Sequence, residues 1–336
     1  MNSVKFFSLF TLYSLLFTSF VLYSYTQVDL NLTLSSNPVY QTIQRQLTNI
    51  GYFNRPQSTA IFFAILAGLV ACYLLIVIFH DKWKLTTRQL WQLLFAFCFL
   101  LFVSYPAFAH DIFNYMFDAR TVVKYAQNPY LTTPLDFPND DWTRFMRWTH
   151  VSSVYPPGWL ITTIPFYLLG FGKFTLTLLS FKFLGMISFL ASSWLMLKIA
   201  GRHAWILWSF NPMILIESLS SVHNEITMVA FTLLAFYIVG VNKKNTAPYF
   251  SLIFAGLIKY ISFLLLPFIN HPARAAVAAW VGALAFFIMR EVNPWYIILP
   301  VSISFMSKNR FLTKFAIIAS LFVMYRYYPC VAIFSC

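Results

Sequence analysis

The chain has 336 residues, of which 60% are hydrophobic, 20% are aromatic and only 10% are charged. A soluble domain carries roughly 25% charged residues, so this composition excludes an ordinary soluble protein and indicates an all-α, polytopic membrane protein. The net charge of +13 does not indicate nucleic-acid binding, because excess Lys and Arg in such proteins normally lie in cytoplasmic loops.

The hydrophobic stretches predict a bundle of about nine to eleven segments of roughly 20 residues each. The N-terminal stretch MNSVKFFSLFTLYSLLFTSFVLYSY resembles a signal peptide but has no small-x-small cleavage site, so we expect it to remain as the first membrane helix. The clear apolar segments are 5–24, 59–80, 87–109, 174–198, 203–220, 225–241, 275–290, 294–307 and 311–328. Two more, 157–171 and 247–269, are interrupted by Pro, Gly or Lys.

The basic clusters predict the orientation of these segments, because Lys and Arg near the membrane normally face the cytoplasm. The clusters are Lys5, Lys82/Lys84/Arg88, Lys198/Arg202, Lys243/Lys244, Arg274 and Lys308/Arg310. The outer connections are then 25–58, 110–156, 221–224 and 290–296. With this orientation, 157–171 and 247–269 must each return to the side from which they entered, which is tolerated where a segment lines a wet cavity. The alternative is that one cluster breaks the rule and both segments span.

Two outer connections are long enough to form a layer on the membrane surface. Residues 25–58 are polar and predict an interfacial helix near QTIQRQLTNIGYF. Residues 110–156 form the longest and most polar connection, and Trp142 and Trp148 are typical of an amphipathic layer at the interface.

The stretch AHDIFNYMFDAR, residues 109–120, predicts a helix that starts after Ala109. At 100° per residue, one face of this helix carries Asp111, Asn114, Tyr115 and Asp118. Arg120 and Lys124 fall on the other face, where we expect them to meet lipid head groups. An acidic residue in a first turn also offsets the helix dipole, which would explain Asp111 without any function but leaves Asp118 unexplained.

Three further motifs place polar residues near the outer connections. QNPY ends at Tyr130, and VYPPGW places Tyr155 on a corner made rigid by two prolines. The stretch SSVHNE interrupts an apolar region that already contains Glu217, and it brings His223, Asn224 and Glu225 to a helix start. Such a trio beside lipid is costly unless it is partnered; the alternative is a capped helix with a surface histidine.

The C-terminal third of the chain adds cationic and aromatic positions. Lys259 is isolated within AGLIKYISFLLLPF, and a lysine this deep in an apolar segment is expected to pair with an anion or to face water. Arg290 and the pair Trp295–Tyr296 follow at a predicted outer boundary, where an interfacial anchor also explains Trp295. Together the motifs predict a wet polar site that opens to the outer leaflet and suits a substrate that is part sugar or phosphate and part lipid.

The ordered motifs DIFNYMFDARTVVKYAQNPY, VYPPGW, NPMILIESLSSVHNE, LIKYISFLLLPF and NPWY resemble those of the polytopic C-type (GT-C) glycosyltransferases. The likeness covers residues 105–300, and it is greatest to the bacterial polyprenol-phosphate-mannose-dependent α-mannosyltransferases. This chain departs from their pattern in two places. It has Glu225 where Asp is common after His-Asn, and Pro156 where Gly often follows the tyrosine.

The resemblance implies one GT-C-like transmembrane domain over residues 1–336, with the outer loops 25–58 and 110–156 as an active-site cap. It implies a polyprenyl-phosphate-linked sugar donor and a site that faces the non-cytoplasmic side of a bacterial plasma membrane. The acceptor would be a hydroxyl of a glycan, glycolipid or protein. Mannose is the expected sugar, with glucose and arabinose left open, and no nucleic acid is expected as a partner.

By the same resemblance, Asp111 matches the general base of an inverting transfer, with Asp29 in the first outer loop as a rival. Lys259 and Arg290 are expected to meet the leaving phosphate, with His223 as a third group. The expected substrate-binding residues are Asn114, Tyr115, Asp118, Tyr130, Tyr155, His223, Asn224, Glu225, Lys259, Arg290 and Tyr296. This route requires no cofactor and no metal, although Asp111 with Glu225 could ligate a divalent cation through a thin set of oxygens.

Two other functions are compatible with the same residues. A lipid or sugar transporter or flippase would use Lys259 and the carboxylates as a permeation path, without transfer chemistry. An assembly subunit would have Asp111 packed away from any groove. The ordered motifs of the long outer loop favour the enzyme.

Overall fold

The computed structural model describes residues 2–30, 32, 35–241 and 246–333. Every regular element in these residues is helical and none is a strand, so the expected all-α fold is confirmed. Five helices are long and apolar enough to cross a membrane, as a polytopic membrane protein requires: Lys5–Gln27, Arg55–Phe79, Phe174–Ala200, Pro272–Met289 and Arg310–Ile333. The pair of Pro212–Ser220 and Glu225–Val241 is bent by 114° and forms either a sixth, broken span or a re-entrant loop.

Several predicted segments are shorter or more broken than the hydropathy pattern indicates. The predicted segment 87–109 is helical only from Thr87 to Phe102, because the chain runs through Pro106 before the next helix. The predicted segment 203–220 breaks at Asn211, whose side chain caps a new helix that has Pro212 in its first turn. Hydrophobicity therefore located the apolar segments but overestimated how many of them are continuous spans.

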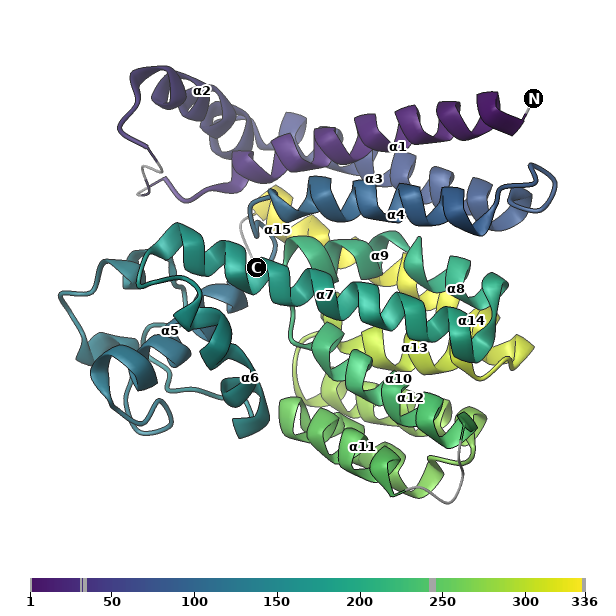
Figure 1. Cartoon of the computed structure of the whole chain (residues 1–336). Coiled ribbons are helices and arrows are strands. Elements are labelled where there is room, and N and C mark those ends of the chain that lie inside the picture. Colours follow the sequence, from purple (N-terminus) through teal and green to yellow (C-terminus); the bar gives the residue numbers. More distant parts are fainter. Residues whose placement is uncertain (1, 31, 33–34, 242–245, 334–336) are drawn as a thin grey trace.

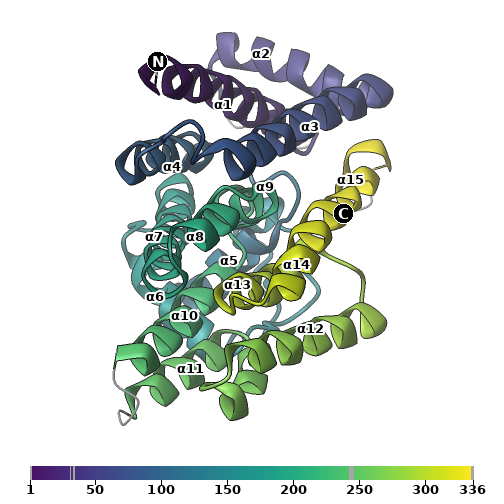
Figure 2. The same ribbon diagram turned by 90° about the vertical axis from the view of Figure 1, so that its right-hand side faces the viewer.

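The N-terminal third forms its own layer, seen at the top of both Figure 1 and Figure 2. Its long helices are α1 (Asn2–Ser24), α3 (Arg55–Phe79) and α4 (Thr87–Phe102), and α1 packs on the other two. Between α1 and α3 lie η1 (Tyr25–Gln27), α2 (Pro38–Thr48) and η2 (Asn49–Phe53). The prediction of a helix near QTIQRQLTNIGYF is thus confirmed, and its place at a membrane interface stays a prediction.

The remaining helices form the body of the molecule. Its first part contains α5 (Asp111–Tyr125), η3 (Pro134–Asp136), η4 (Asp141–Phe145), α6 (Pro157–Leu168), α7 (Phe174–Ala200), α8 (Arg202–Ser209), α9 (Pro212–Leu215), η5 (Ile216–Ser220) and α10 (Glu225–Val241). Its second part contains α11 (Ala247–Ile258), η6 (Tyr260–Phe268), α12 (Pro272–Met289), η7 (Pro294–Ile297), α13 (Ile298–Met306), α14 (Arg310–Phe322), η8 (Val323–Arg326) and α15 (Tyr327–Ile333).

The two ends of the molecule differ in the kind of connection that they carry. In Figure 1, α2 and the segment from α5 to α6 lie at the left end, whereas the α3–α4, α7–α8 and α13–α14 connections lie at the right. These three connections hold three of the six basic clusters, so the arrangement agrees with the expected orientation. The cluster Lys243/Lys244 lies outside the described residues.

The segment 247–269 is a hairpin with Lys259 at its turn. α11 ends at Ile258, Lys259 takes an extended conformation, and the chain returns as η6, with the Phe263 ring packed over Gly256. Both limbs are apolar and α12 packs along η6. A returning segment is what the predicted re-entrance requires, and its depth in the membrane stays a prediction.

Candidate active site

Asp111 lies at the point where the chain leaves the α4–α5 connection and begins α5. It is the first residue of this helix, where a carboxylate offsets the helix dipole, and 22% of its side chain is exposed. Its Oδ2 lies 3.4 Å from Nδ1 of His223. Burial alone would raise the pKa of Asp111. The neighbouring His223 and Lys259 lower it by more than burial raises it, so the pKa lies below its ordinary value. Asp111 is therefore a carboxylate at neutral pH.

His223 is presented by a tight turn between η5 and α10. The residue before it, Val222, has a φ of 56°, which is rare for a β-branched residue and marks local strain. Gly185 of α7 lies against this turn, and a Cβ added there would come within 2.7 Å of Val222 Cγ1 and 2.9 Å of the Ser218 oxygen. A backbone hydrogen bond of 3.0 Å from the His223 nitrogen to the Glu217 oxygen closes the turn.

The imidazole of His223 lies between two carboxylates. Nε2 is 3.1 Å from Oε2 of Glu217, and the side chains of both residues are 1% exposed. The contacts of His223 with Asp111 and Glu217 are ion-pair contacts whose angles depart from hydrogen-bond geometry. The Trp295 ring stacks on the imidazole at 4.1 Å and 18°. The other oxygen of Glu217 accepts a hydrogen bond from the Tyr327 hydroxyl.

Lys259 pairs with Glu225 at the turn of the α11–η6 hairpin. Its ammonium contacts Oε1 of Glu225, the first residue of α10, and lies 5.1 Å from the centre of the Tyr296 ring. A cavity of about 10 Å³ next to the pair has room for one water molecule. The sequence predicted that Lys259 meets an anion or water, and the structure identifies the anion as Glu225.

An aromatic wall made of Tyr115, Tyr155 and Trp159 lies beside these groups. Tyr155 and Trp159 meet the Tyr115 ring edge-on at 4.6 Å and 5.0 Å. The Tyr115 hydroxyl accepts a hydrogen bond of 3.5 Å from the Asn224 nitrogen, and Tyr130 donates one of 3.0 Å to the Tyr155 oxygen. These contacts connect α5, the QNPY turn and the start of α6 to the His-Asn-Glu turn.

Gly158 explains why the YPPGW motif meets the hairpin so closely. A Cβ at this position would lie 2.7 Å from Leu257 Cβ and 2.8 Å from the Leu257 oxygen. The start of α6 therefore packs directly against α11, two residues before Lys259. This close approach brings the aromatic wall next to Lys259.

The other predicted residues of α5 face the same side. Asn114 donates a hydrogen bond of 3.5 Å to the Trp148 oxygen, and Asp118 accepts one of 2.7 Å from the Ser153 hydroxyl. Burial raises the pKa of Asp118 to about 7, an increase that Ser153 only partly offsets. Asp118 is thus a carboxyl that titrates near neutral pH.

Several buried polar atoms of this group have no hydrogen-bond partner in the described part of the chain. They are Asn114 Oδ1, Glu217 Oε2, both imidazole nitrogens of His223, Asn224 Oδ1 and Glu225 Oε2. More than nine in ten buried polar groups in proteins are satisfied, so such a concentration needs an explanation. Four of the six atoms are oxygens that accept hydrogen bonds, and a polyhydroxylated ligand would supply donors to those that it reaches.

The sequence also places the chain in a protein family. The family model described as alpha-(1->6)-mannopyranosyltransferase, N-terminal domain, matches residues 18–285. The chain belongs to this family. It is a mannosyltransferase-family glycosyltransferase, as the GT-C resemblance implied. Searches of curated proteins and of solved structures found no match.

The match contains most of the mannosyltransferase's candidate site. Asp111, His223 and Lys259 lie within residues 18–285, whereas Tyr296 and Tyr327 lie after them. No three His, Cys, Asp or Glu residues within the described ranges are placed to hold a metal ion. The expectation that the enzyme needs no metal stays a prediction.

Two predicted residues of this mannosyltransferase are not brought into the group. Arg290 is exposed at the end of α12, and its side chain makes no hydrogen bond or ion pair with another described residue. Asp29, the rival base, is exposed after η1, where it lies near Tyr52 and Tyr105 and contributes to the raised pKa of both. The roles of Arg290 and Asp29 stay predictions.

Sequence reasoning left out three residues that hold the group together. Glu217 was visible as an acidic residue in an apolar segment, whereas Tyr327 has no local signal. Lys182 is a lysine in the middle of α7, and it is buried with its ammonium 2.7 Å from the Ser104 oxygen and 3.2 Å from the Ser220 oxygen. It therefore joins the connection before Asp111 to the turn before His223.

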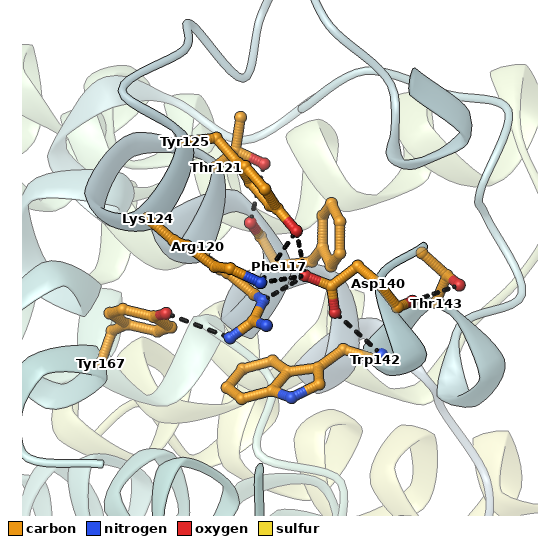
Figure 3. A network of polar contacts seen from close by, with 9 residues as sticks. All are labelled: Phe117, Arg120, Thr121, Lys124, Tyr125, Asp140, Trp142, Thr143 and Tyr167. Atoms are coloured by element: carbon orange, nitrogen blue, oxygen red, sulfur yellow. Dashed lines mark hydrogen bonds and ion pairs between the residues drawn. The ribbon is translucent and has the colours of Figure 1, made fainter. Parts of the chain in front are cut away.

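The opposite face of α5 carries the network drawn in Figure 3. Asp140 accepts hydrogen bonds from Arg120 Nε at 2.6 Å, from Lys124 Nζ at 3.2 Å, from the Tyr125 hydroxyl and from the Trp142 nitrogen at 3.0 Å. Arg120 also lies 3.9 Å above the Trp142 ring. The prediction that Arg120 meets head groups is therefore wrong, because the loop folds back and buries Arg120 on Asp140. The Lys124 side chain is 45% exposed, and its contact with head groups stays a prediction.

Proposed function

We propose that this mannosyltransferase transfers a mannosyl group from a polyprenyl-phosphate-linked donor to an acceptor hydroxyl on the non-cytoplasmic side of the membrane. The transfer inverts the anomeric carbon, with Asp111 as the general base. The observation that carries the proposal is the convergence of Asp111, His223 and Lys259 from three separate breaks in the helices. An ionised carboxylate beside fixed cationic groups, partly open to solvent, supplies what such a displacement needs.

The chemistry divides between the two sides of the anomeric carbon. The acceptor hydroxyl is a weak nucleophile, and Asp111 takes its proton as the bond from the acceptor oxygen to C1 forms. The bond from C1 to the phosphate oxygen breaks, and its electron pair leaves with the phosphate. Because the phosphate departs as an anion, this side requires a cation rather than a proton.

Lys259 is the proposed cation for the leaving phosphate. Glu225 neutralises it in the free protein, and a bound phosphate would compete with Glu225 for the same ammonium. Arg290 is a second candidate, from the end of α12, and His223 is a third. No metal or other cofactor takes part in this route.

The polar atoms without partners would bind the sugar. Donors from mannose hydroxyls would satisfy Asn114, Asn224 and Glu225, whose free oxygens are buried. The rings of Tyr115 and Tyr155 form an apolar wall against which a sugar face can pack. Tyr130, Asp118 and Tyr296 complete the binding residues.

The two ends of the molecule support the proposed side of the membrane. The outer segments 25–58 and 110–156 lie at the end opposite the basic connections, which supports a site on the non-cytoplasmic side. We take these two segments as the cap of the site within one GT-C-like domain. The bilayer is then a bacterial plasma membrane, and the polyprenyl chain stays in its lipid phase.

The test is product formation by the purified protein. Mannosyl-, glucosyl- and arabinosyl-phosphopolyprenol are each incubated with glycan, glycolipid and peptide acceptors, and products are identified by mass spectrometry. We expect mannosylated product with the anomeric configuration opposite to that of the donor, measured by NMR, and unchanged yield in the presence of EDTA. Donor that crosses a vesicle membrane without any covalent product would contradict the transfer.

The base is tested by two matched substitutions. Asp111→Asn should lower kcat by about 10²- to 10⁴-fold, the usual contribution of a general base, while donor affinity is retained. Asp29→Asn should keep the wild-type rate. The reverse pattern would assign the base to Asp29 instead.

A further inference from the structure

A chain of four polar side chains runs from the buried end of the site to Asp111. Tyr327 of α15 donates to Glu217 of η5, Glu217 contacts His223, and His223 contacts Asp111. Tyr327 and Glu217 are 110 residues apart and both are buried. Only Asp111 among the four is partly exposed, so it is the member most open to a substrate.

Burial restricts the charge states that this chain can adopt. An ionised carboxylate as enclosed as Glu217 is tolerated only when it is neutralised by a partner, and among the described residues its partners are the His223 imidazole and the Tyr327 hydroxyl. A tyrosine hydroxyl supplies a hydrogen bond but no charge. The countercharge must come from His223, and the stacked Trp295 face also favours a cationic ring.

The hydroxyl of Tyr327 is itself held rigidly. Its ring contacts Phe108, just before Asp111, at 5.2 Å, and Phe62 of α3 edge-on at 5.7 Å. The backbone bond from His223 to Glu217 fixes the other end of the chain. Ring packing therefore holds the Tyr327 end of the chain of side chains, and a backbone hydrogen bond holds the His223 end.

We infer that Glu217 and Tyr327 are positioning residues that hold His223 as an imidazolium beside Asp111, which keeps the base ionised and correctly aimed. The inference rests on the proposed function, in which Asp111 accepts the acceptor proton. In that step the proton goes to Asp111, the new bond to C1 forms, and the electron pair of the old bond leaves on the phosphate. Glu217 and Tyr327 exchange no proton with the substrate.

Other titratable groups surround the Asp111–His223 pair and enter any pH profile. These are His110 beside Asp111 with Arg147 near it, Tyr115 and Tyr155 from the aromatic wall with Asp118 near Tyr155, and Lys259 with Glu225 at the hairpin turn. Burial lowers the pKa of His110 to about 3, so it stays neutral in the working range. We therefore assign the low-pH limb of activity to Asp111 and the high-pH limb to loss of the His223 proton.

The experiment measures kcat, donor KM and the pH profile of kcat for Glu217→Gln and Tyr327→Phe. Glu217→Gln removes the negative charge that stabilises the His223 imidazolium. The kcat should then fall about 10- to 100-fold with donor KM unchanged, and the high-pH limb should move to lower pH. Tyr327→Phe removes one hydrogen bond and should lower kcat about 5-fold, with a smaller movement in the same direction. Tyr328→Phe, an exposed neighbour, is the matched control and should be unchanged.

Two outcomes would overturn the inference. One is a wild-type kcat and pH profile in both variants, and the other is a lower kcat with an unmoved high-pH limb, which would indicate a purely structural role. Where Glu217→Gln does not fold, Tyr327→Phe applies the same criteria. The activity of Asp111→Asn is measured in parallel. If this variant stays active, the proposed base is wrong. If it is inactive while the Glu217 and Tyr327 variants keep the wild-type kcat and pH profile, only the positioning role is rejected.

Discussion

Opposite faces of α5 carry two polar clusters that differ in how completely they are satisfied. Around Asp140, four donors converge on one carboxylate (Figure 3). Around His223, buried nitrogens and oxygens lie close to one another, but several have no hydrogen-bond partner among the described residues. A satisfied network makes a loop rigid, whereas open acceptors in an enzyme of this family leave places for a substrate. On the proposed function, this difference separates a structural cluster from the one where the reaction takes place.

The largest effect on stability is expected at the satisfied cluster. Asp140→Asn leaves the buried Arg120 without its partner, so the free energy of unfolding should fall by roughly 3 kcal/mol. This loss is at the low end of the range for breaking a buried ion pair, because Asp140 also pairs with Lys124, whose side chain is 45% exposed. Unfolding in detergent measures the loss, and donor affinity of the folded fraction should not change. A loss of donor affinity without a loss of stability would place Asp140 in the site and contradict the distinction between the two clusters.

The Asp140 carboxylate should also make the free energy of unfolding depend on pH in the acid range. Despite burial, which raises it, the pKa of Asp140 is held at about 2 by the bonds from Arg120, Tyr125 and Trp142. Because this value lies below that of the unfolded chain, the contribution is complete above about pH 4 and is lost as the pH falls toward 2. Asp140→Asn should lack this dependence.

The reactive cluster should respond in donor binding rather than in stability. Replacing Lys259 alone would leave Glu225 buried and unpaired, so the test uses the double variant Lys259→Met/Glu225→Gln. Its donor Kd should rise about 30-fold, or about 2 kcal/mol, from the lost contact with phosphate. Glu225→Gln alone frees the ammonium and should bind donor at least as tightly as the wild type, measured by calorimetry. Equal affinity of the two variants would remove Lys259 from the phosphate site.

Asp118 offers an intermediate effect that depends on pH. Its folded pKa of about 7 lies above the unfolded value, so ionisation destabilises the fold; the penalty is absent below about pH 4 and complete above about pH 7. Asp118→Asn should therefore stabilise the protein by on the order of 2 kcal/mol at pH 8 and have little effect at pH 4. Thermal unfolding at both pH values measures this, and an equal shift at the two values would contradict it.

The smallest effect is expected for an exposed ion pair. Glu291 pairs with Arg326, and the Glu291 side chain is 73% exposed. Glu291→Gln should change the free energy of unfolding by about 0.5 kcal/mol or less, because water and salt screen such a pair. A change of the size expected for Asp140→Asn would mean that burial is not what distinguishes the clusters.

The sequence predicted the breaks in the helices better than the contacts between them. The polar turn before Glu225 and the interruption at Lys259 are both present. Both were visible because a polar group in an apolar segment is costly and needs a local reason. The same reasoning assigned Arg120 to lipid head groups, since a helical face shows which side chains point together but not what covers them.

Composition and local pattern by themselves determined that the protein is an all-α membrane protein, where its apolar segments lie, and that Asp111 begins a helix. These properties depend on hydrophobicity and on neighbours a few residues away. Only the tertiary structure decided that Glu225 neutralises Lys259, that Lys182 joins two connections, and that Tyr327 reaches Glu217. Those contacts join residues 34 to 110 positions apart, and helix packing, which no local pattern records, brings them together.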